Sequence, residues 1–91
     1  MKAYRRTVTL TDEQRQQLQQ WRDHHPQPYV RERCAAILKV ADGWTAHAVA
    51  WRGLLRPRDP DTVYAWLDRF ATEGLAGILG HPQGGYRRGY L

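Results

Sequence analysis

The chain has 91 residues, 42% hydrophobic and 25% charged, which is the size and composition of one small globular domain and excludes a two-lobed cofactor fold or a large catalytic cleft. Its single cysteine, Cys34, excludes an internal disulfide and indicates a reducing, cytoplasmic setting; the sequence shows neither a membrane-spanning apolar run nor a signal peptide. The net charge of +5 gathers at the two ends and beside one turn, which favours a polyanion as partner.

The chain begins with a basic arm over residues 1–10, which carries three cations and no acidic residue. Thr11, followed by the sequence DEQ, has the pattern of a capping box, so we expect the first helix to begin at about Asp12 and to end at Trp21 or slightly later. The core face of this helix is predicted to consist of Leu18 and Trp21.

Two more helices are predicted between the prolines of HHPQP and those of LLRPRDPD, because closely spaced prolines interrupt a helix. The first of them should end at a left-handed Gly43, and its apolar residues at helical spacing are Val30, Cys34, Ile37, Leu38 and Ala41. Thr45 can cap the second, which should end near Gly53 and bury Ala46, Val49 and Ala50.

A fourth helix is predicted from Asp59-Pro60, an N-cap acid followed by the residue best tolerated at the first helical position. In its sequence TVYAWLDRF one stripe is apolar and should pack on the core: Val63, Trp66, Leu67 and Phe70. The helix should end near Gly74, and residues 80–91, rich in Gly and Tyr, should form a flexible basic tail.

These elements predict an all-α fold, since no strand-like alternation of four or more residues occurs. Two helices joined by a turn and braced by earlier helices are typical of a homeodomain-like helix-turn-helix bundle. We therefore expect residues 11–79 to form a DNA-binding domain of about four short helices with basic flexible ends.

Three segments carry a resemblance to a known family: LTDEQRQQLQQW, RERCAAILKVADGWTAHAVA and TVYAWLDRFATEGLAGIL. In order and spacing, over roughly residues 9 to 80, they resemble the N-terminal helix-turn-helix domain of bacterial mariner-like insertion-sequence transposases. The resemblance implies binding to the terminal inverted repeats of a transposon, with the cut-and-join chemistry in a separate metal-dependent domain. The chain departs from the family pattern at Ala65, where a basic residue is common, at Asp68, in a longer turn WRGLLRPRDPD, and in a tail that lacks the family's Gly-Arg-Pro.

The candidate DNA contacts lie in the turn, in the fourth helix and at the two ends. The hydroxyls of Thr62 and Tyr64 can reach a phosphate or a base edge, although a solvated Thr62 and a Tyr64 packed on a neighbouring residue are the alternatives. The arginines expected to contact DNA are Arg5, Arg6, Arg56, Arg58, Arg69, Arg87 and Arg88, and the four at the two ends are expected to bind phosphates or the minor groove. Their alternatives are surface ion pairs, of Arg56 or Arg58 with Asp59 or Asp61 and of Arg69 with Asp68 or Glu73, or mere solubilising charge at the ends.

Catalytic and metal sites are not expected in this sequence. The four histidines are scattered, and no Cys or His pair has zinc-finger spacing. Asp59 and Asp61 are better explained as capping residues than as magnesium ligands, and neither a phosphate-binding glycine loop nor a nucleophile motif occurs. We therefore expect no enzyme activity and no cofactor.

Three functions remain open at this point. The first is a sequence-specific module for transposon ends, working with a transposase catalytic domain or subunit. The second is a stand-alone transcriptional regulator of the same fold, for which a homodimer reading two half-sites is expected. The third is a protein-interaction module, in which exposed Trp44, Trp51 or Tyr residues form an apolar docking patch.

Overall fold

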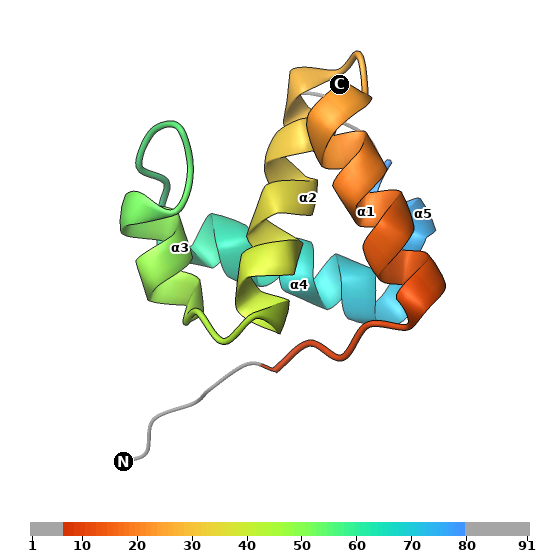
Figure 1. Cartoon of the computed structure of the whole chain (residues 1–91). Helices are drawn as coiled ribbons and strands as arrows, with labels where there is room; N and C mark the ends of the chain where they lie inside the picture. Colours follow the sequence, from red (N-terminus) through yellow and green to blue (C-terminus); the bar gives the residue numbers. More distant parts are fainter. Residues whose placement is uncertain (1–6, 80–91) are drawn as a thin grey trace, which may run out of the picture.

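The computed structural model describes residues 7–79 and contains five helices in that range (Figure 1). They are α1 (Asp12–His24), α2 (Pro28–Ala41), α3 (Ala46–Arg52), α4 (Pro60–Glu73) and α5 (Leu75–Ile78). The all-α class is confirmed for this part of the chain. The expected four helices are present, and α5 is one helix more than the sequence predicted. The basic arm up to residue 6 and the tail from residue 80 lie outside the described residues.

The predicted helix starts are confirmed by their hydrogen bonds. At the start of α1 the Thr11 hydroxyl accepts from the Gln14 amide and the Gln14 side chain accepts from the Thr11 amide, each at 3.0 Å. The Thr45 hydroxyl accepts from the amide three residues later to cap α3, and the Asp59 carboxylate caps α4. Local side-chain chemistry therefore sets where each of these helices begins.

Two glycines turn the chain where a helix ends. Gly43, just past α2, has a φ of 112°, and Gly74, between α4 and α5, has a φ of 65°. Both angles lie in the region that residues with a Cβ rarely adopt. Gly77 in α5 lies against α4, because a Cβ there would come within 2.6 Å of the Arg69 carbonyl oxygen. The chain reversal at Gly74 and this close approach explain how a four-residue helix packs on α4.

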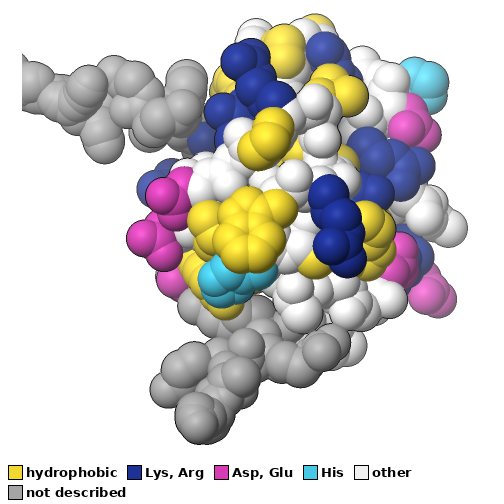
Figure 2. Space-filling model, turned by 90° about the vertical axis from the view of Figure 1, so that its left-hand side faces the viewer, with side chains coloured by type: hydrophobic (Ala, Val, Ile, Leu, Met, Phe, Trp, Pro, Cys, Tyr) yellow, Lys and Arg dark blue, Asp and Glu magenta, His cyan; other side chains and the backbone are white. Residues whose placement is uncertain are grey.

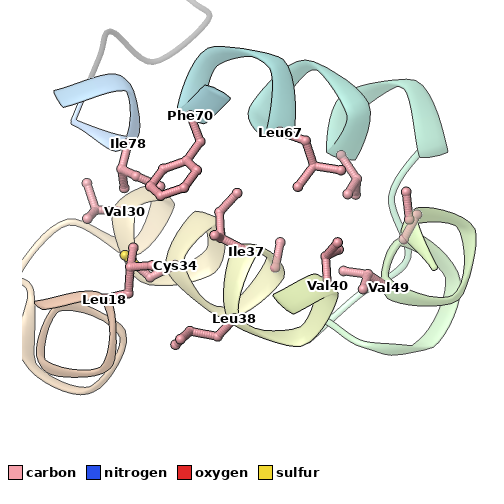
Figure 3. Close-up of a cluster of buried hydrophobic side chains, with 14 residues drawn as sticks. Leu18, Val30, Cys34, Ile37, Leu38, Val40, Val49, Leu67, Phe70 and Ile78 are labelled. Atoms are coloured by element: carbon pink, nitrogen blue, oxygen red, sulfur yellow. The ribbon is translucent and has the colours of Figure 1, made fainter. Parts of the chain in front are cut away.

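The helices form two groups around one core. In Figure 1, α1 and α2 lie side by side, and α4 crosses the base of α2 between α3 at one end and α5 at the other. The core between them contains the predicted apolar stripes of α2, α3 and α4, together with Leu18 and Ile78 (Figure 3). Trp21, Ala41 and Trp66 are only half-buried, so these three predicted core positions lie at its edge.

One arginine belongs to this interior. Arg33 is 6% exposed, and its Nη1 donates a hydrogen bond of 3.2 Å to the carbonyl oxygen of Ile78 in α5. Its guanidinium lies 4.9 Å from the centre of the Tyr29 ring and 5.9 Å from that of Trp66. Burial lowers the pKa of Arg33, and the nearby charge of Arg69 lowers it further. Arg33 thus ties α2 to α5 across the end of α4.

Candidate nucleic-acid interface

The helix-turn-helix unit consists of α3, the turn of residues 53–59, and α4. The buried stripe of α4 fixes its orientation, because Val63, Leu67 and Phe70 all face the core. The opposite side, which we call the solvent face of α4, consists of the exposed residues Asp61, Ala65, Asp68, Arg69, Thr72 and Glu73. Three carboxylates and one guanidinium make this face acidic, which opposes phosphate binding.

The first turns of α4 contact α3 through aromatic rings. The Tyr64 hydroxyl lies 3.5 Å from His47 Nδ1, and the two rings meet edge to face at 5.8 Å. The ring of His47 also meets that of Trp51, one helical turn along α3, at 5.3 Å. We call His47, Trp51 and Tyr64 the aromatic cluster. Figure 2, which faces the α3 side, shows a hydrophobic patch beside a histidine, with Lys or Arg side chains around it.

The turn is fastened to α2 by Arg58. Its Nε and Nη2 donate to the two carboxylate oxygens of Glu32 at 2.6 and 2.8 Å, and its backbone amide donates to the Ala50 carbonyl at 2.7 Å. The bidentate hydrogen bonds to Glu32 raise the pKa of Arg58. From the sequence, Arg58 was expected either to contact DNA or to form an ion pair with Asp59 or Asp61. The structure shows an ion pair, but its partner is Glu32 of α2.

Between the turn and α2 lies a groove of about 750 Å³, which we call the arginine groove. Its charged lining consists of five arginines and one glutamate: Arg22, Arg31, Glu32, Arg52, Arg56 and Arg58. Its uncharged lining consists of Pro28, Tyr29, Ala35, Gly53, Leu54 and Leu55. The groove therefore combines a high positive charge with an apolar surface.

The structure divides the residues predicted to contact DNA among separate places. Arg56 and Arg58 both line the arginine groove. Thr62 and Tyr64 are half-buried and lie in the first turns of α4. Arg69 is exposed on the second half of α4. Arg5, Arg6, Arg87 and Arg88 lie outside the described residues. The DNA contacts of all these residues stay predictions.

Sequence reasoning missed other residues of these surfaces. His47 and Trp51 lie at i and i+4 on α3, a spacing that indicates a shared face, although only Trp51 was considered for a surface role. Arg22, Arg31 and Arg52 were not among the predicted DNA contacts. The fold brings these three arginines from different helices to one groove, and no spacing along the chain signals that.

Between residues 7 and 79, no three side chains of His, Cys, Asp or Glu come together as metal ligands would. None of the helices in that range has the length and apolarity needed to cross a bilayer.

Comparisons with known proteins identify a family for the chain. Neither the curated proteins nor the solved structures include a match to this chain. A family model described as winged helix-turn helix matches residues 33–91, which include the part of α2 from Arg33 onward and all of α3, α4 and α5. The match supports a DNA-binding domain and does not distinguish a transposase from a regulator. It covers more than half of the chain, and the chain therefore belongs to the winged helix-turn-helix family.

Proposed function

We propose that this domain recognises the terminal inverted repeats of a transposon and works together with a separate catalytic domain or subunit. The observation that carries the proposal is the presentation of α4: its buried stripe holds it across α2, and α3 packs against its first turns. The family match supports binding to DNA, and the three sequence segments that resemble transposase domains support the choice of transposon ends. On this proposal the chain recognises DNA, and the separate domain or subunit cuts and joins it.

Within this function, the start of α4 reads DNA better than its middle does. Thr62 and Tyr64 supply hydroxyls there, and the positive end of the helix dipole favours a phosphate. The Asp59 carboxylate partly offsets that advantage, since it accepts a hydrogen bond of 2.8 Å from the Asp61 amide. Farther along, Ala65 offers no hydrogen bond and Asp68 repels phosphates.

The experiment is a fluorescence anisotropy titration with two labelled duplexes, one carrying the terminal repeat of the element that encodes the chain and one a scrambled sequence. We expect tighter binding to the repeat. About four to six phosphate contacts should give a slope of log K against log salt of about −4 to −5. Binding that stays flat from low to moderate salt would contradict the DNA function. Equal binding to both duplexes, with tight binding to an operator near the gene, would instead favour a regulator.

A second candidate function is protein interaction through the aromatic cluster. Trp51 is 61% exposed beside His47, and Arg58 is turned toward Glu32 on α2, so an apolar surface is presented next to α4. The partner on this interpretation is a catalytic subunit of the same transposition system. Co-purification of such a subunit with the parent chain but not with Trp51→Ser, while both bind DNA equally, would support it. Equal co-purification of the two would contradict it.

A further inference from the structure

The arginine groove gathers cations from four segments of the chain. Arg22 comes from α1, Arg31 from α2, Arg52 from α3, and Arg56 and Arg58 from the turn. Glu32 is the one carboxylate in the lining, and it accepts hydrogen bonds from Nε and Nη2 of Arg58. The remaining arginines therefore face the groove without a carboxylate from its own walls.

The arginines other than Arg58 differ in how they are held. Arg22 pairs with its neighbour Asp23 at 3.0 Å. Arg31 donates from Nη1 to the carbonyl oxygen of His25 at 2.6 Å, which orients the guanidinium. Because a carbonyl group is neutral, this hydrogen bond does not cancel the positive charge of Arg31. Arg52 lies 5.9 Å from the ring centre of Trp44. Within residues 7–79, no ion pair holds Arg31, Arg52 or Arg56. The groove thus offers three guanidiniums to an anion.

We propose that the arginine groove binds the sugar-phosphate backbone of DNA, as a contact surface in addition to the start of α4. This inference rests on the proposed DNA binding and identifies where the phosphates are held. Planar guanidinium groups match phosphate oxygens, and each phosphate contact releases condensed counterions. The solvent face of α4 is acidic, so phosphate attraction from the described residues comes mainly from the groove.

The position of the groove also favours DNA over an acidic protein. Arg52 is the last residue of α3, and Arg56 lies in the turn that leads into α4, so the groove continues from the helix-turn-helix unit. A backbone that passes α4 has a path along these side chains. Tyr29, Leu54 and Leu55 can then pack against deoxyribose, which is the less polar part of the backbone.

The test compares arginine variants in the salt-dependent anisotropy titration on a labelled 20-base-pair duplex. Arg52→Gln and Arg56→Gln should each weaken binding about three- to tenfold at 0.1 M NaCl and make the salt slope about one unit shallower. Arg15→Gln is the control, because it removes the same charge from an arginine of α1 that pairs with Asp42 at 3.3 Å and does not line the groove. It should leave the slope as in the parent. Circular dichroism verifies that each variant is folded.

Three substitutions of Leu55 change the groove without removing an arginine. Leu55 is fully exposed, so its substitution costs no packing. Leu55→Asp should weaken DNA binding relative to its isostere Leu55→Asn, since only the charge at the groove differs between them. Leu55→Lys should strengthen binding, because it adds a positive charge there.

The outcomes separate this inference from the proposed function. If the parent binds DNA with a steep salt slope but the groove variants match Arg15→Gln, the groove holds no phosphate and the inference is wrong, while DNA binding stands. In that case an acidic protein segment is the better occupant of a groove with exposed leucines. If the parent does not bind duplex DNA at all, the proposed function itself fails.

Discussion

The solvent face of α4 and the arginine groove are joined by one turn and carry opposite charge. The first presents three carboxylates and one guanidinium, and the second presents five guanidiniums and one carboxylate. Both surfaces include residues of the same helix-turn-helix unit. The difference shows that the helix with the clearest recognition pattern in the sequence is not where the described positive charge gathers.

The turn produces this division. The ion pair between Arg58 and Glu32 and the hydrogen bond from the Arg58 amide to Ala50 fold the turn back against α2. The turn therefore carries Arg56 toward Arg31 and not toward the middle of α4. If DNA binds as we propose, base contacts at the start of α4 and phosphate contacts in the arginine groove fall on neighbouring but separate surfaces.

The largest expected effect concerns which side of α4 is the inner one. Phe70 is 7% exposed, so Phe70→Ala should lower the free energy of unfolding by about 3 to 5 kcal/mol, as for other large core aromatics. Ala65→Gln, on the solvent face, should change it by no more than about 0.5 kcal/mol. Urea denaturation followed by circular dichroism measures both. Equal losses in the two variants would show that the solvent face has been assigned to the wrong side.

Trp66→Ala provides an intermediate case on the same helix. Trp66 is half-buried at the edge of the core and lies near Arg33, so its loss should cost about 2 to 3 kcal/mol, less than a fully buried aromatic. Urea denaturation gives the value. A cost larger than that of Phe70→Ala would mean that Trp66 and not Phe70 is the main anchor of α4.

The two sides of α2 can be distinguished by thiol chemistry. Cys34 faces the core, where burial raises the pKa of its thiol to about 12, whereas its neighbour Ala35 lines the arginine groove. In an Ala35→Cys variant at pH 8, the new thiol should react with iodoacetamide on the order of a hundredfold faster than Cys34, which holds almost no thiolate. Mass spectrometry of timed samples identifies the modified residue. Equal rates would contradict the placement of the groove on α2.

A positive charge added to the solvent face of α4 tests whether that face approaches DNA. Ala65→Arg places a guanidinium on the acidic face and should tighten binding to duplex DNA about three- to tenfold and steepen the salt slope by about one unit. Ala65→Gln is the uncharged control in the same anisotropy titration. If Ala65→Arg gains nothing over that control, the solvent face of α4 does not approach DNA.

Much of the fold was readable from the sequence because its signals are local. The caps at Thr11, Thr45 and Asp59, and the apolar stripe of α4, involve residues within a few positions of one another. The short helix α5 was missed, because four residues carry no helical period and its place depends on Gly77 approaching the backbone of α4.

The surfaces were less readable because they depend on contacts between distant segments. Arg58 and Glu32 are 26 positions apart, and Tyr64 and His47 are 17 apart. Many carboxylates in the chain could have paired with Arg58, and only packing of the turn on α2 selects one. The sequence placed Arg56 and Arg58 in the turn before α4, where the structure has them, but it did not predict that this turn folds back against α2.

The smallest expected effect concerns the hydroxyl of Tyr64, where α3 and α4 meet. Tyr64→Phe keeps the ring and its edge-to-face contact with His47, so the free energy of unfolding should change by no more than about 0.5 kcal/mol. The hydroxyl lies 3.5 Å from His47 Nδ1, at the outer limit of a hydrogen bond, and can turn toward a phosphate when DNA is bound. We therefore expect DNA binding to weaken about two- to fivefold, the share of one neutral hydrogen bond. His47→Phe, which removes the other partner and keeps an aromatic ring, should leave affinity within about twofold if the Tyr64 hydroxyl acts on DNA directly. If Tyr64→Phe binds like the parent and His47→Phe is the variant that weakens binding, the contact at the start of α4 belongs to the histidine, and the assignment of Tyr64 to DNA is wrong.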